Sequence, residues 1–320
     1  MKTKHNLELK PLFVERMKEL LEEDFKSYLE ILEVLPVRSF RCNTLKISPE
    51  NLKKRLENNG WEINQPWKDY LEVMVVSSPL KPGELGNSLE HLLGYYYIQE
   101  LASMLPVLVL KPEKNQLVLD LCAAPGSKTT QMSACMENTG TIIANEISLG
   151  RLRVLATNLE RCGASNVIIT KKEGSAFCKR LERENIQFDK ILLDAPCSGE
   201  GTIRSTPKTP VMWNINTVNL LSKMQKELVT SVISVLKKGG ELVYSTCTHA
   251  PEENEEIVDF ILKNFPSMKI EKILLPIESR QGIKIWKDKE YSEDVKFSCR
   301  VYPHVANTEG FFVAKFKKIK

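Results

Sequence analysis

The chain has 320 residues, 42% of them hydrophobic and 27% charged, with a formal net charge of +4, a mildly basic balance that permits a polyanionic partner without requiring one. Its length favours one large domain with a smaller one. Because no apolar run reaches the ~18–20 residues of a bilayer span and the N-terminus lacks the apolar segment of a secretory signal, we expect a cytoplasmic protein with no membrane partner.

Residues 1–93 have the pattern of a small α+β domain. Apolar residues recur at helical spacing up to Pro36, which ends the run. A later helix is expected to begin behind the N-cap Ser48 and to stop at Gly60. The predicted elements are one or two helices within Pro11–Leu35, a strand Ser39–Leu45, a helix Glu50–Asn59, and strand and loop over Trp61–Val76.

Residues 94–320 alternate strands with helices, which is typical of a mostly parallel, doubly wound α/β sheet. Within its first helix, Pro106 is expected to kink the helix or end it early. The predicted strands are Gln116–Cys122, Thr141–Asn145, Asn166–Thr170, Lys190–Asp194 and Glu241–Ser245. The predicted helices are Gly94–Leu110, one after the first strand, Leu149–Cys162, Val218–Leu236 and Glu252–Asn264, and Met268–Leu275 and Phe311–Phe316 are expected to form a final hairpin.

Two features of composition have ordinary explanations. The stretches 111–114, 171–183 and 315–320 are locally basic, and each alone is more often a solvated face than a binding patch. The eight cysteines include no CxxC spacing, so we expect no structural zinc or other metal site. A chain of this size needs no disulfides, and reduced, mostly buried thiols fit it best.

The segment DLCAAPGSKTT, from Asp120 to Thr130, directly follows the first strand of the doubly wound sheet and opens a helix. Ligands of such sheets lie at the carboxyl ends of the strands. A Pro-Gly turn with small neighbours lets a ligand approach the backbone, and helix N-terminal amides can hold a carboxylate. The glycine count fits neither GxxxxGK[ST] nor GxGxxG. We therefore expect a ligand-binding turn rather than a plain connection.

Two acids follow the next strands. Glu146 lies about 20 residues after Gly126, which is the spacing of an acid that accepts hydrogen bonds from a ribose. Taken alone, an acid at a strand end is weak evidence, because many such acids are only helix caps. With the turn, Glu146 indicates a cofactor that contains adenosine, and Glu173, at the exit of the third strand, could reach the adenine edge.

Two cysteines lie just past strand ends, Cys197 in DAPCSGEG and Cys247 in YSTCTHAPEENE. A pair of thiols suits methylation at carbon 5 of cytosine, because this carbon is by itself a poor nucleophile. A thiolate that adds to carbon 6 makes an enamine, which can attack a sulfonium methyl. A second group could then assist loss of the carbon 5 proton. Asp194 is placed to hydrogen-bond the base near N3, and unstacking the base costs little in single-stranded RNA.

Over nearly its whole length the sequence resembles the Nol/Nop/Sun family of RNA cytosine-5 methyltransferases. The motifs that carry the resemblance are RCNTLK (41–46), GYYYIQE (94–100), DLCAAPGSKT, DAPCSGEGT, YSTCTHAPEENE and TEGFFVAKF. The resemblance implies a Rossmann-like class I sheet that depends on S-adenosylmethionine (94–320) behind a small N-terminal α+β domain that binds RNA (1–93).

The resemblance also implies roles. Cys247 would attack carbon 6 and Cys197 would assist release, with Asp194 and Lys128 acting at the base. Cytosine-5 enzymes of DNA take the nucleophile from the PC motif, so Cys247 indicates RNA. The cofactor residues would be Cys122, Ala123, Ala124, Pro125, Gly126, Ser127, Lys128, Glu146, Arg151, Glu173 and Asp194.

The chain departs from the family pattern at Glu173, where the family usually has Asp, and in STCT, where STCS is commoner. Its compact form resembles archaeal-type members that act on tRNA, which implies a tRNA partner and a monomer that forms 5-methylcytosine. Two other hypotheses stay open: a methyltransferase of a protein or small molecule, and a non-catalytic RNA-binding protein that keeps the fold. The second thiol has no purpose in either.

Overall fold

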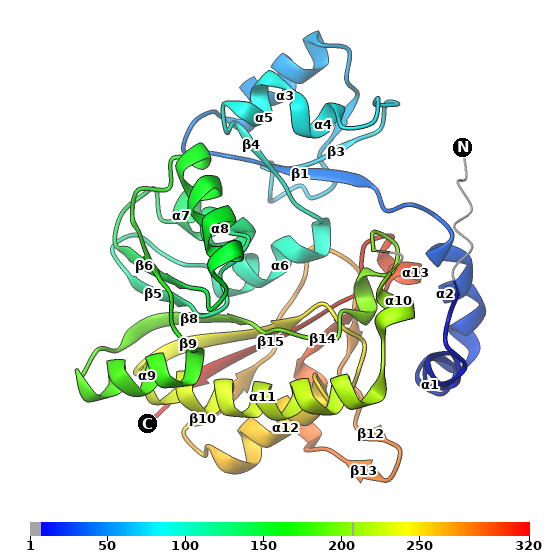
Figure 1. Cartoon of the computed structure of the whole chain (residues 1–320), viewed down its shortest axis with the longest axis vertical. Helices are drawn as coiled ribbons and strands as arrows, with labels where there is room; N and C mark the ends of the chain where they lie inside the picture. The colour runs from blue at the N-terminus through cyan, green and yellow to red at the C-terminus, as the bar shows by residue number, and fades with distance from the viewer. Residues whose placement is uncertain (1–7, 207) are drawn as a thin grey trace.

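A small antiparallel sheet lies above a large mixed sheet in the computed structural model, which describes residues 8–206 and 208–320 (Figure 1). The small sheet has the order β2-β3-β1-β4. Its strands are β1 (Arg38–Cys42), β2 (Ile63–Asn64), β3 (Val73–Val76) and β4 (Tyr96–Ile98). Its helices are α3 (Pro49–Asn58), α4 (Glu84–Asn87) and α5 (Leu89–Leu92). Ser48 caps α3 as predicted, because its side chain accepts from the amide of Asn51.

The large sheet confirms the predicted doubly wound α/β architecture. Its order is β11-β14-β15-β9-β8-β5-β6-β7, and β10 pairs with β15. The strands β7, β6, β5, β8 and β9 are parallel, and the chain changes direction across the sheet at β5, where ligands of such folds bind. The strands are β5 (Leu117–Asp120), β6 (Thr141–Asn145), β7 (Val167–Thr170), β8 (Phe188–Asp194), β9 (Leu236–Thr246), β10 (Met268–Glu271), β11 (Arg280–Gln281), β14 (Cys299–Val301) and β15 (Phe311–Lys318).

Helices cover both faces of the large sheet, which explains why its central strands are continuously apolar. On one face lie α6 (Leu101–Leu110), α7 (Ser127–Cys135) and α8 (Leu149–Cys162), and on the other α9 (Gly174–Arg183), α11 (Ile215–Ser234) and α12 (Glu255–Asn264) (Figure 1). The remaining short elements are α10 (Thr209–Met212), α13 (Pro303–Ala306), β12 (Ile285–Trp286) and β13 (Lys289–Glu290), with 3-10 turns at Glu22–Asp24, Glu200–Thr202 and Glu293–Phe297.

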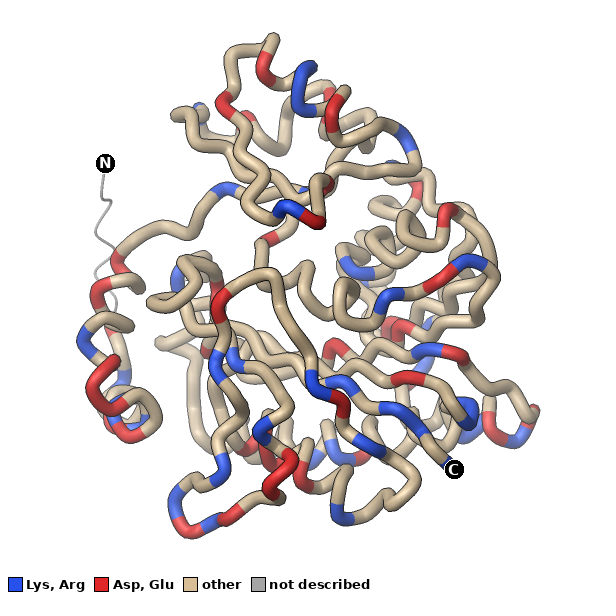
Figure 2. Tube along the Cα trace, turned by 180° about the vertical axis from the view of Figure 1, so that it is seen from behind, with Lys and Arg blue, Asp and Glu red and all other residues tan. Residues whose placement is uncertain are grey.

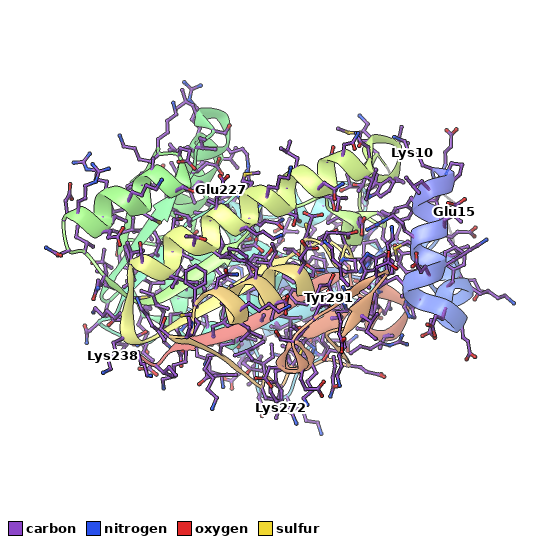
Figure 3. The ribbon with its side chains drawn as sticks, turned by 90° about the horizontal axis from the view of Figure 1, so that it is seen from below. Lys10, Glu15, Glu227, Lys238, Lys272 and Tyr291 are labelled. Carbon is purple, nitrogen blue, oxygen red and sulfur yellow. The ribbon has the colours of Figure 1, made fainter. Side chains whose placement is uncertain are left out.

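The first two helices, α1 (Pro11–Leu21) and α2 (Phe25–Leu32), pack on the large domain. Arg16 makes a bidentate pair with Glu252 at 3.0 and 2.8 Å. Figure 3 shows α1 beside the first turns of α11, where the Lys10 ammonium donates to the carbonyl of Trp213 at 2.7 Å. The division at residue 93 stays a prediction, since α1 and α2 contact the later part of the chain.

The structure differs from the predicted helix 94–110 and from the predicted final hairpin, and it contains one helix that was not predicted. The first residues of the predicted helix 94–110 form β4, because they pair with β1, and the Glu100 side chain then caps α6 through the amides of Ala102 and Ser103. Pro106 does not end this helix early, since α6 continues to Leu110. The predicted hairpin is wrong: β10 and β15 pair, but β11 to β14 lie between them in the chain. Helix α9 was not predicted.

Figure 2 shows Lys and Arg positions interspersed with Asp and Glu positions along the backbone rather than gathered by sign in one region. In the basic stretch at the C-terminus, Lys315 pairs with Glu241 at 3.1 Å and Glu271 at 3.4 Å. Lys114 pairs with Glu137 at 2.7 Å. These stretches are therefore partly neutralised by acids. Within the described residues, no helix has both the length and the apolar character needed to cross a membrane.

Candidate active site

The predicted ligand-binding turn connects β5 to α7. Gly126 has φ +103°, a conformation that favours glycine, and a Cβ there would lie 2.9 Å from a methyl of Leu155. Beneath the turn, Asp120 is fully buried and accepts from the Thr129 hydroxyl at 2.7 Å. Burial, with the nearby charge of Asp194, raises the pKa of Asp120 to about 7.

Asn145, which the sequence analysis did not single out, joins three strand ends. Its amide donates to the carbonyls of Leu121 at 3.2 Å and Lys172 at 3.1 Å. Its oxygen accepts from the Thr170 hydroxyl at 3.0 Å and from the amide of Lys172 at 3.1 Å. Asn145 therefore fixes the geometry at the exits of β5, β6 and β7. The sequence signal for it was a polar residue at the end of an otherwise apolar strand.

A cavity lies at these three exits, beside α11. Four predicted cofactor residues line it, whereas Ala123 and Ala124 belong to a small apolar cluster with Leu155 and Leu159 and do not line it. Pro125, Gly126, Ser127, Lys128 and Asp194 do not line this cavity. The lining residues are Leu121, Cys122, Asn145, Glu146, Ile147, Arg151, Lys172, Glu173, Gly174, Pro196, Met224 and Leu228.

The two predicted acids differ in their surroundings. Glu146 is buried; one oxygen accepts from the amide of Ser148 at 2.8 Å and the other lies 3.3 Å from Arg151. Arg151 in turn donates to the carbonyl of Ala124 at 2.6 Å, which ties the acid to the turn. Glu173 is exposed and caps α9 through the amides of residues 175 and 176. Glu173 is therefore the N-cap of α9, and its side chain also lies at the cavity wall.

Lys128 and Asp194 form an ion pair at 2.7 Å between α7 and the end of β8. Ser245 donates to the other oxygen of Asp194 at 2.8 Å. The ammonium of Lys128 also donates to the Ser103 hydroxyl at 3.1 Å and lies 5.3 Å from the centre of the Phe311 ring. The carboxylate is thus held in one orientation by donors from two elements. The sequence did not predict the contribution of Ser103 or Ser245.

The two predicted thiols are in contact. The sulfurs of Cys197 and Cys247 are 3.3 Å apart, and the amide of Cys247 donates to the sulfur of Cys197 at 3.3 Å. All eight cysteines are free thiols. The hydrogen bond to Cys247, together with burial, raises the pKa of Cys197. Two sulfurs this close do not both carry a negative charge, which agrees with the raised pKa of Cys197.

Close backbone contacts bring the two cysteine loops together. The amide of Gly201 donates to the carbonyl of Cys247 at 2.9 Å, and the amide of Gly310 donates to the carbonyl of Gly201 at 2.9 Å. A Cβ at Gly201 would lie 2.2 Å from the oxygen of Gly310. Only glycine fits this approach, which explains the glycine four residues after Cys197.

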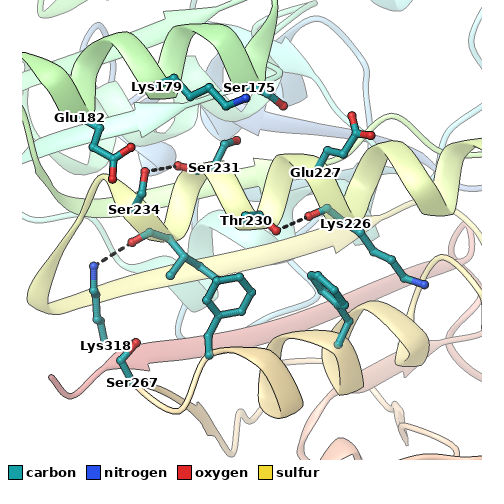
Figure 4. Close-up of a pocket in the computed structure, with 13 residues that line it drawn as sticks. Ser175, Lys179, Glu182, Lys226, Glu227, Thr230, Ser231, Ser234, Ser267 and Lys318 are labelled. Carbon is teal, nitrogen blue, oxygen red and sulfur yellow. Dashed lines mark hydrogen bonds between the residues drawn. The ribbon is translucent and has the colours of Figure 1, made fainter.

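A wider hollow lies away from this site, between α9, α11 and α12. Figure 4 shows Lys179 of α9, Glu227 of α11 and Lys318 of β15 around it. None of the predicted site residues lines it, and it does not lie at the carboxyl ends of the parallel strands. The candidate site is therefore the smaller cavity and the thiol pair beside it.

Comparisons with known proteins show which families and proteins the chain resembles. A family model described as 16S rRNA methyltransferase RsmB/F matches residues 107–317, and one described as the N-terminal domain of 16S rRNA methyltransferase RsmF matches residues 9–101. A tRNA (cytosine(49)-C(5))-methyltransferase of Pyrococcus abyssi is 41% identical over 95% of this chain and 95% of its own length.

Two further similarities extend over most of the chain. The ribosomal RNA small subunit methyltransferase F of Psychromonas ingrahamii is 40% identical over 96% of this chain, which spans 63% of that relative's length. A solved methyltransferase homolog protein from Pyrococcus horikoshii superposes with a TM-score of 0.85 at 36% identity, covering 98% of this chain and 96% of the other.

Proposed function

Because the chain belongs to the RsmB/F family of S-adenosylmethionine-dependent RNA cytosine-5 methyltransferases, which is the Nol/Nop/Sun family of the sequence analysis, we propose that it methylates a cytosine of tRNA with two thiols of unequal role. The observation that carries this proposal is the contact of Cys197 and Cys247 at 3.3 Å, beside a cavity at the strand exits. A transferase of proteins or small molecules needs only the cavity, and a non-catalytic RNA-binding protein needs neither.

The cavity has the donors and acceptors that S-adenosylmethionine requires. Glu146 offers a buried carboxylate suited to ribose hydroxyls, with Arg151 close to it, and Leu121 and Leu228 offer apolar walls suited to a flat ring. In this proposal Glu173 lies at the adenine. The turn from Cys122 to Lys128, with Asp194 nearby, holds the methionine end. When bound, the cofactor supplies an activated methyl group.

The first step forms a bond between the sulfur of Cys247 and carbon 6 of the base. The electron pair of the thiolate enters the ring, and carbon 5 becomes nucleophilic enough to take the methyl group. Asp194 hydrogen-bonds the base near N3 and its amino group and favours this addition. Ser245 and Lys128 hold Asp194 for this role, at 2.8 and 2.7 Å.

The second step releases the product. Carbon 5 now carries both the methyl group and a hydrogen. Once the sulfur of Cys247 is bonded to carbon, its hydrogen bond and its charge no longer raise the pKa of Cys197, and Cys197 can pass its proton to solvent water. The Cys197 thiolate then takes the carbon 5 proton. The double bond between carbons 5 and 6 reforms, and Cys247 leaves as a thiolate.

Two substitutions test these roles. Cys247→Ala is expected to abolish both methylation and any covalent complex with RNA. Cys197→Ala is expected to transfer the methyl group once and then remain bonded to the RNA, which a shifted band on a denaturing gel detects. If Cys197→Ala turns over normally and Cys247→Ala gives the shifted band, the two roles are reversed.

The tRNA substrate is supported by the archaeal relative, of which the chain covers 95%, whereas it covers 63% of the ribosomal relative. Transfer of labelled methyl to purified tRNA and to 16S rRNA, followed by bisulfite sequencing of the labelled RNA, separates the two. Methylation of 16S rRNA alone would contradict this part of the proposal.

We also propose that the enzyme works in the cytoplasm as a monomer. Eight free cysteines fit a reducing compartment. Light scattering from the purified protein in dilute solution is expected to give the mass of one chain, and a mass of two chains would contradict the monomer.

A further inference from the structure

Two fully buried side chains hold the peptide on each side of Cys197. Gln225 of α11 donates to the carbonyl of Pro196 at 2.8 Å. Glu253, in the loop before α12, accepts from the amide of Ser198 at 3.0 Å. Gln225 also donates to Glu253 at 2.9 Å, so the two side chains that hold this peptide are bonded to each other. The residues before and after Cys197 are therefore fixed from the same side.

The Gln225–Glu253 pair is also connected to the loop that carries Cys247. The Ser198 hydroxyl donates to Glu253 and lies 2.7 Å from the hydroxyl of Thr248, the residue after Cys247. The Tyr244 hydroxyl, on β9, donates to the carbonyl of Glu253 at 2.5 Å. Glu253 is thus joined to both cysteine loops without touching either sulfur.

Stability alone does not explain a carboxyl group at this place. Glu253 is fully buried, and in residues 8–206 and 208–320 it takes part in no ion pair within 4.0 Å. A buried carboxyl without a cation lowers the stability of a fold, and apolar residues fill such space at least as well. Burial raises the pKa of Glu253 to about 8, so the group is largely protonated at neutral pH.

We propose that Glu253, with Gln225, is a positioning residue of the release step, which holds the Cys197 thiol where it can take the carbon 5 proton. This inference rests on the proposed function. Without the hydrogen bonds from Gln225 and Glu253 the Cys197 loop can move. A displacement of about 1 Å at a reacting group can lower the rate by about 100-fold. Addition and methyl transfer depend on Cys247, which directly follows β9, a strand held on both sides by its pairing with β8 and β15.

The test compares variants at two adjacent glutamates. In Glu253→Ala, methyl transfer in the first turnover is expected within about twofold of wild type, while steady-state turnover falls at least about tenfold and the covalent complex with RNA accumulates. Glu253→Gln is expected to recover most of the turnover, because an amide can replace a protonated carboxyl group. Gln225→Leu, which keeps the volume, repeats the measurement if Glu253→Ala does not fold.

Glu252→Gln is the matched control, since its carboxylate contacts Arg16 and Trp286 instead. It is expected to lower thermal stability without accumulation of the complex. Release at the wild-type rate in Glu253→Ala or Gln225→Leu, or an equal loss in first and later turnovers, would overturn the positioning role. If Cys197→Ala itself gives no covalent complex, the proposed function fails, whatever the Glu253 variants show.

Discussion

Lys128 is buried and connects the cofactor turn to the strand end that precedes Cys197. It belongs to the helix that follows the cofactor turn, yet its ammonium pairs with Asp194, at the end of the strand that leads to Cys197. It also donates to Ser103 and faces the Phe311 ring. A single side chain thus links the cofactor turn to the acid proposed to orient the base.

Lys128→Met is therefore expected to lower kcat by about 100-fold, because Asp194 loses the cation that orients it. Steady-state methylation assays measure the loss. Lys190→Met is the control, since Lys190 is also buried and pairs with Glu241 at 3.0 Å, away from the predicted site residues. The control should lose stability and keep kcat. Wild-type kcat in Lys128→Met would refute the role given to this pair.

At the scale of elements, the RCNTLK motif joins the small sheet to the cofactor helices. Arg41, fully buried at β1, donates to the Thr130 hydroxyl in α7 at 2.9 Å. Asn43 donates to the carbonyls of Gly94 at 2.8 Å and Cys162 at 2.7 Å, the latter at the end of α8. The motif therefore holds α7, which begins at the turn, and α8, which packs against Gly126 of the turn.

Asn43→Ala leaves two buried carbonyl groups without a donor, so we expect a loss of about 1–3 kcal/mol in the free energy of unfolding. Weaker binding of S-adenosylmethionine should accompany it, because α8 carries Arg151. Urea denaturation and calorimetry measure the two effects. Asn51→Ala, on the exposed face of α3, is the control and should change neither. Unchanged stability in Asn43→Ala would contradict the proposed role of the motif in stabilising these helices.

The elements show what the sequence could predict. The parallel strands were predictable because burial on both faces makes them apolar runs, and the turn and cysteine motifs follow directly after them. Helix α9 was missed because its start depends on the cap made by Glu173, a residue read only as a ligand. Strand β4 was missed because it forms by pairing with the edge of β1, a contact between distant segments. Asn145, Gln225 and Glu253 act through contacts between distant segments, which no local pattern reveals.

At the scale of the whole molecule, several buried carboxyl groups form no ion pair within the part of the chain that the structure describes, and they make stability depend on pH. The pKa of Asp120 is raised to about 7, and those of Glu309 and Glu253 to about 7 and about 8, each mainly by burial. Such a group holds its proton in the folded state at a pH where the unfolded chain has released it. Its stabilising contribution is full below the unfolded pKa and is lost as pH rises through the folded pKa.

Asp120→Asn removes one of these titrations, and its side-chain oxygen can still accept from Thr129. Relative to the variant, wild type is expected to lose up to about 4 kcal/mol of stability between about pH 4 and pH 7. Denaturation of both proteins across this range measures the difference. A difference that stays constant with pH would contradict the raised pKa of Asp120.

The central claim is that the two thiols have unequal roles, and the most direct test finds which sulfur holds the RNA. Cys197→Ala is incubated with S-adenosylmethionine and tRNA, the covalent complex is digested with protease and nuclease, and mass spectrometry locates the modified peptide. We expect a methylated cytidine on Cys247. A nucleotide attached to any other residue, or no covalent complex from a folded variant, would contradict the account.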